Sequence, residues 1–134
     1  MKFRFVAFGF LALYALVFLV PGFFTLPPLD RDESRFAQAT KQMLETGDFV
    51  EIRYQDSARN KKPVGIYWMQ AASATALGGP EAAPIWAYRI PSAIGALLAI
   101  VFTYLAGTAL LPQRAAALGA ALFGISMLLV AEGH

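Results

Sequence analysis

Charged residues are absent from three long stretches of the chain, and polar sequence separates the first stretch from the second. The charge-free stretches cover residues 5–29, 90–113 and 115–131. A helix needs roughly 20 predominantly apolar residues to cross the hydrocarbon core of a bilayer. The pattern therefore predicts an all-α membrane protein with about three transmembrane helices, at residues 5–26, 90–111 and 115–131.

The intervening segment, residues 27–89, is predicted to be a long loop that carries two surface helices. Within residues 33–46, side chains recur at helical spacing on one face, namely Phe36, Ala39, Thr40, Met43 and Leu44. Such spacing predicts an amphipathic helix, which we expect at the membrane surface. Asp30 and Glu33 resemble a capping box at its start, and Gly47 is a natural stop at its end.

A second helix is expected over residues 64–77. This segment is uncharged but too short to span a bilayer, and Tyr67 and Trp68 favour an interfacial position. The connection over residues 48–62 is predicted to be irregular, with short extended pieces around residues 49–54.

Composition supports a membrane protein and excludes several other classes. The 134 residues are 57% hydrophobic, which is high for a soluble domain of this size. There is no cysteine, so disulfides and cysteine-based metal sites are excluded, and the net charge of +2 is too small to indicate a nucleic-acid partner. Lys2 and Arg4 precede an apolar run longer than a signal-peptide core, which favours an uncleaved signal anchor.

The third predicted span carries small residues at every fourth position, namely Ala116, Ala120 and Gly124. A face of this kind allows another helix to pack closely against it. Three spans bury little core of their own, so we expect an N-terminal portion of a longer polytopic protein.

The charges alone leave the orientation open. Lys2, Arg4 and Arg114 favour a cytoplasmic N-terminus, but the polar loop between residues 30 and 62 contains seven basic residues and could by the same rule be cytoplasmic.

The first polar turn after the apolar run contains three acidic residues, Asp30, Asp32 and Glu33. One interpretation is structural, because carboxylates near a helix N-terminus interact favourably with the helix dipole, by roughly 0.3 to 1 kcal/mol. The other interpretation is catalytic, and it depends on the pattern of the whole loop.

That pattern resembles the first extracytoplasmic loop of GT-C glycosyltransferases that use polyprenyl-phosphate sugars, such as the lipid A 4-amino-4-deoxy-L-arabinose transferases and protein O-mannosyltransferases. The resemblance is carried by Asp-Glu-Ser-Arg-Phe-Ala at 32–37, Met-Leu-Glu-Thr-Gly-Asp-Phe at 43–49, Lys-Pro at 62–63 with Tyr-Trp at 67–68, and Tyr-Arg-Ile-Pro-Ser at 88–92. Their order and spacing together are more specific than any one of them.

The resemblance implies roles for four residues. Asp32 would be the catalytic carboxylate and Glu33 its support, while Arg35 and Lys62 would bind the phosphate of the lipid-linked donor. Guanidinium suits bidentate phosphate binding, and ammonium acts as a compact point charge. The polar loop would then lie outside the cytoplasm at the inner (plasma) membrane, with the N-terminus inside.

The implied function is sugar transfer from a polyprenyl-phosphate donor to a lipid or protein acceptor, with a divalent metal left open and no nucleic-acid partner. Lys61 departs from the glutamate common at this position in the arabinose transferase branch, which puts a metal site there in doubt. The alternative hypothesis is a non-catalytic membrane scaffold or transporter fragment, whose charges lie in a loop because charges in lipid are costly.

Overall fold

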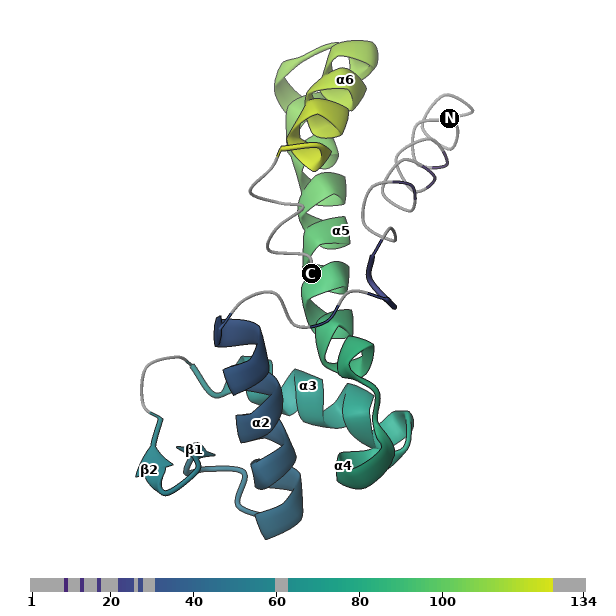
Figure 1. Ribbon diagram of the computed structural model, residues 1–134. Helices are drawn as coiled ribbons and strands as arrows, with labels where there is room; N and C mark the ends of the chain where they lie inside the picture. The colour runs from purple at the N-terminus through teal and green to yellow at the C-terminus, as the bar shows by residue number, and fades with distance from the viewer. Residues whose placement is uncertain are drawn as a thin grey trace. The chain divides into compact units, whose positions relative to one another are not determined.

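The computed structural model describes residues 9, 13, 17, 22–25, 27, 31–59 and 63–126 (Figure 1). The described part of the chain is predominantly helical, as the sequence predicts. Its elements in chain order are α2 (Arg31–Thr46), β1 (Arg53–Tyr54), β2 (Ser57–Ala58), α3 (Gly65–Ala76), α4 (Gly79–Ala82), α5 (Ile85–Leu110) and α6 (Gln113–Gly124).

The chain divides into two compact units. One, which we call the loop unit, covers Phe24–Pro91, and the other, the span unit, combines Met1–Phe23 with Ser92–His134. Most of the predicted first span, residues 5–26, and the last part of the third, residues 127–131, lie outside the described residues.

In the loop unit, α2 packs its predicted apolar face against α3 and the segment between them. Ala39 and Met43 are buried with Ile52, Tyr67 and Ala71, and the partly buried neighbours of this cluster are Phe36, Leu44, Val64 and Ile66. The face that recurs at helical spacing in the sequence is therefore covered largely by protein. This packing fixes α2, whose first turn carries the candidate catalytic acids.

Buried hydrogen bonds connect α2, α3 and the start of α5. The Thr40 hydroxyl donates to Oε1 of Gln70 at 2.8 Å, and Nε2 of Gln70 donates to the Tyr88 carbonyl at 2.9 Å. Buried polar groups need such partners, because an unsatisfied one costs about 1–3 kcal/mol. These bonds connect the three segments within the loop unit.

The connection after α2 is more ordered than the sequence indicates. Gly47 has a φ of 71°, a left-handed conformation that suits glycine at a helix C-terminus. β1 and β2 then form an antiparallel pair with Arg53 opposite Ala58. β1 falls within the predicted extended segment, whereas β2 and the short α4 were not expected.

α5 begins at Ile85, five residues before the predicted start of the second span, and it contains Pro91. Proline has no N–H to donate to the carbonyl four residues earlier, which belongs to Ala87. The Ser73 hydroxyl donates to that carbonyl at 2.7 Å instead. A side chain of α3 thus supplies the donor that proline lacks, so the Ala87 carbonyl keeps a hydrogen bond at the start of α5.

Among the residues that the structure describes, α5 is the one helix long and apolar enough to cross a membrane. Its 26 residues have a mean hydropathy of 2.0 in the most apolar window. This agrees with an α-helical membrane protein.

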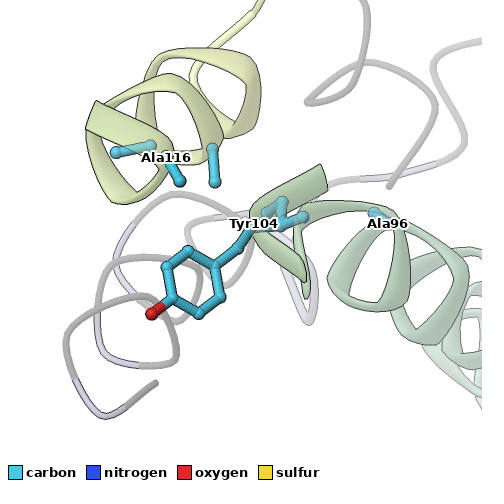
Figure 2. Close-up of a cluster of buried hydrophobic side chains, with 6 residues drawn as sticks. Ala96, Tyr104 and Ala116 are labelled. Atoms are coloured by element: carbon cyan, nitrogen blue, oxygen red, sulfur yellow. The ribbon is translucent and has the colours of Figure 1, made fainter. Parts of the chain in front are cut away.

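In the span unit, α5 and α6 share a cluster of small and aromatic side chains (Figure 2). Ala116 and Ala120 of α6 are buried together with Ile100 and Tyr104 of α5. A Cβ placed on Gly107 would lie 3.1 Å from that of Ala116, so the two helices approach closely there. The prediction that a helix packs on the small-residue face is confirmed.

Candidate functional site

The candidate site lies at the start of α2, where Asp32 and Glu33 occupy the first helical turn. Backbone N–H groups in a first turn have no partner within the helix, and the helix dipole favours negative charge there. Local physics therefore accounts for acids at this place. It does not account for the cations that converge on them from distant parts of the loop unit.

Glu33 forms a largely buried ion pair with Arg89 of α5. Nε of Arg89 lies 2.5 Å from Oε1 of Glu33, and the two side chains are 2% and 18% exposed respectively. Nη2 of Arg89 also donates to the Pro27 carbonyl at 3.3 Å. A buried guanidinium needs a counter-charge and hydrogen-bond acceptors, so Glu33 anchors α2 to the beginning of α5.

Asp32 has a different environment, because its side chain is 54% exposed. Its Oδ1 lies 3.6 Å from Nη1 of Arg35, one helical turn later, and 3.6 Å from Nη2 of Arg59. Two predicted site residues, Asp32 and Arg35, are thus adjacent. A carboxylate that is solvent-accessible and flanked by two guanidiniums can interact with a substrate while its neighbours interact with an anion.

Arg59 is a member of the site that the sequence reasoning missed. Its side chain is only 10% exposed, and its Nε donates to the Tyr67 hydroxyl at 3.0 Å. The guanidinium carbon lies 5.2 Å from the centre of the Phe36 ring, within the range of a cation–π contact. Arg59 is one of several basic residues in a polar loop, and no local pattern distinguishes it from the others.

Lys62, the second predicted phosphate ligand, lies outside the described residues, as do Asp30 and Lys61. Its role therefore stays a prediction.

Tyr67 corrects one expectation. The sequence suggested an interfacial anchor, but the residue is completely buried between α2 and α3. The reason is its partners, since the Phe36 ring packs against it at 5.2 Å and its hydroxyl accepts from Arg59. Trp68 is half exposed, and its indole N–H donates to the Phe49 carbonyl at 2.8 Å.

The described acids around α2 do not fit a divalent metal. Within the described residues, no group of three or more potential ligands of the His, Cys, Asp and Glu types comes together. Of the two carboxylates in the first turn of α2, Glu33 is paired with Arg89, and Asp32 faces two guanidiniums. A metal cation at Asp32 would be repelled by both arginines.

A separate polar groove of about 620 Å³ lies between the second half of α2 and the hairpin, and Asp48 and Asp56 are among its lining residues. Hydrogen bonds from the backbone N–H groups of Glu51 and then Val50 lower the pKa of Asp48 below its usual value. These bonds fix the turn after α2. Asp32, Glu33 and Arg35, the predicted site residues that the structure describes, do not line this groove.

Comparison with known proteins supports the resemblance seen in the sequence. The chain is 35% identical over 117 residues to the undecaprenyl phosphate-alpha-4-amino-4-deoxy-L-arabinose arabinosyl transferase of Yersinia enterocolitica. The aligned region covers 87% of this chain and 20% of that protein. The chain is 32% identical over 124 residues to proteins of the same name from Yersinia pestis and Yersinia pseudotuberculosis. No protein-family profile and no solved structure matches the chain.

The chain spans about a fifth of the length of these curated relatives. The similarity includes most of this chain and therefore extends well beyond a single short motif.

Proposed function

We propose that the chain is part of a GT-C membrane glycosyltransferase that transfers a sugar from a polyprenyl-phosphate donor to a lipid acceptor at the extracytoplasmic face. The observation that carries the proposal is the exposed Asp32 carboxylate between Arg35 and Arg59, at a helix start, in a chain similar to named arabinosyl transferases. The names of those relatives make undecaprenyl-phosphate-linked 4-amino-4-deoxy-L-arabinose the first donor to test.

In this proposal Asp32 acts on the acceptor. An acceptor oxygen forms a bond to the anomeric carbon, the bond from that carbon to the phosphate oxygen breaks, and its electron pair leaves with the polyprenyl phosphate. Asp32 takes the proton from the acceptor oxygen, a role that needs an ionised carboxylate accessible to substrate. Its 54% exposure meets the second requirement.

Arg35 and Lys62 bind the donor phosphate. The leaving phosphate gains negative charge as the glycosidic bond breaks, so cations beside it stabilise the transition state more than the ground state. Arg35 is half-buried one turn along the helix from Asp32, and this proximity supports a role for its guanidinium in binding the phosphate beside the proposed catalytic carboxylate.

Glu33 supports catalysis from a distance in this scheme. Its carboxylate is paired with the buried Arg89, so its contribution is to hold the first turn of α2 against the start of α5. In this proposal Asp32 therefore takes part in the chemistry, and Glu33 positions the helix that carries it.

The test is transfer of labelled sugar from purified lipid-linked donor by the full-length protein, comparing wild type with Asp32→Asn. Asparagine keeps the size of the side chain and removes its charge. Loss of a general base typically costs about 100- to 10,000-fold in rate. Glu45→Gln is the matched control, because Glu45 lies on the same helix in an exposed pair with Lys41. Normal expression with wild-type transfer in Asp32→Asn would refute the assignment.

A further inference from the structure

Arg59 contacts the candidate catalytic carboxylate from outside α2 and is itself held in place. Its Nη2 lies 3.6 Å from Oδ1 of Asp32, while Nε is engaged by the Tyr67 hydroxyl at 3.0 Å. The guanidinium is planar, so a bond at Nε and a stack on Phe36 fix the direction in which its remaining N–H groups point.

The support behind Arg59 belongs to the core. Tyr67 is fully buried, and its ring contacts Phe36, which packs on the cluster formed by α2 and α3. The chain of contacts therefore runs from the core through the Tyr67 hydroxyl to Arg59 and then to Asp32. Arg53 lies in the same connection between α2 and α3 but lacks this support. Its side chain is 51% exposed and pairs with the exposed Glu51.

We propose that Arg59 is a positioning residue of the glycosyl-transfer site, which holds the Asp32 carboxylate in the orientation that receives the acceptor proton. The inference rests on the proposed function of Asp32. A carboxylate that is half exposed on the first turn of a helix has several rotamers of similar energy, and a fixed guanidinium selects one of them. Displacement of a reacting group by about 1 Å can cost 100-fold in rate.

The alternative role for a buried arginine near Arg35 is direct binding of the donor phosphate. The two roles differ in kinetics. A residue that orients the base acts on the acceptor proton, so its loss lowers kcat with little change in the KM for the donor. A ligand of the donor phosphate also contributes to donor binding, so its loss raises the KM for the donor together with any fall in kcat. The burial of Arg59 and the engagement of its Nε favour the first role.

The experiment measures kcat and KM for the lipid-linked donor in the full-length protein carrying Arg59→Gln, with Arg53→Gln as the matched control. We expect kcat to fall by about 10- to 100-fold in Arg59→Gln with little change in KM, and Arg53→Gln to behave as wild type. A raised KM for the donor, with or without a fall in kcat, or wild-type kinetics, would overturn the inference.

A second variant, Tyr67→Phe, removes only the hydroxyl that accepts from Arg59 and retains the buried ring. It should lower kcat by about three- to tenfold, the value of one hydrogen bond, without loss of folded protein. Wild-type kcat in Tyr67→Phe would contradict the proposed chain of contacts even if Arg59→Gln fails to fold.

Asp32→Asn separates this inference from the proposed function. If Asp32→Asn abolishes transfer and Arg59→Gln leaves kcat unchanged, only the role of Arg59 is wrong. If Asp32→Asn retains full transfer, the proposed function of Asp32 fails and the role of Arg59 fails with it. If both proposals are right, the double variant Asp32→Asn with Arg59→Gln should show about the same residual transfer rate as Asp32→Asn alone. The reason is that both side chains act through the Asp32 carboxylate.

Discussion

Removal of the Glu33 carboxylate should destabilise the protein far more than removal of any exposed acid on the same helix. The Arg89 side chain is 2% exposed, so its guanidinium has lost nearly all contact with water and depends on protein acceptors. Loss of one member of a buried ion pair typically costs about 3–5 kcal/mol, because the other charge remains buried. Glu33→Gln keeps one acceptor oxygen, and Pro27 supplies another, which favours the lower end, about 3 kcal/mol.

The assay is the free energy of unfolding of the full-length protein in detergent, taken from chemical denaturation followed by tryptophan fluorescence. Glu45→Gln is the control, since it breaks an exposed pair with Lys41 at 3.6 Å on α2. A helical surface pair of this kind contributes only about 0.3–0.5 kcal/mol. Glu33→Gln is therefore expected to lose several times more unfolding free energy than Glu45→Gln.

A double variant tests the cause. Arg89→Met combined with Glu33→Gln removes the buried charge together with its partner, so it should be more stable than Glu33→Gln alone. The reasoning is refuted if Glu33→Gln is no less stable than Glu45→Gln, or if the double variant loses the sum of the two single effects.

Three further predictions concern the scaffold. Ser73→Ala should cost about 1–3 kcal/mol of unfolding free energy, because the Ala87 carbonyl beside the helix proline loses its donor; chemical denaturation measures the change. Gly107→Ala should cost about 1–3 kcal/mol because the new methyl would meet α6 at 3.1 Å, whereas Gly119→Ala, which has open space, should be near neutral in the same assay. The pKa of Asp48 is lower in the folded protein than its ordinary value of 3.8, so the ionised carboxylate stabilises the turn fully above pH 3.8. This stabilisation is lost as the pH falls through the folded pKa, and an NMR titration of the Asp48 carboxyl carbon should give a midpoint below 3.8.

The sequence predicts well those features that arise from local periodicity. Residues spaced along one face of α2 are buried against α3, and the helix covers Arg31–Thr46 where 33–46 was expected. The small-residue face of α6 packs on α5 for the same reason, since side-chain size at every fourth position limits how close two helices come. The positions of the predicted spans and surface helices relative to the membrane stay a prediction.

Two charge pairs of the site, unlike that of Asp32 with Arg35, are not local, and the sequence does not predict them. Arg59 meets Asp32 across 27 positions and Arg89 meets Glu33 across 56, so each pairing depends on how α2, α3 and α5 fold together. A signal did exist for Arg89, because a lone charge at the edge of an apolar span requires a counter-charge nearby. The polar loop contains seven acidic residues, and spacing alone does not choose which of them meets Arg89.

The adjacent acids of α2 show why neighbouring carboxylates need not share a role. Successive residues of an α-helix point about 100° apart, so Asp32 and Glu33 leave the helix in different directions. Glu33 turns to a nearly inaccessible guanidinium and Asp32 to two guanidiniums at a solvent-accessible edge. Asp32 and Glu33, which resemble one catalytic motif in the sequence, thus have two different environments in the structure. Glu33 fixes the helix, and Asp32 depends on that fixed helix for the orientation its proposed chemistry requires.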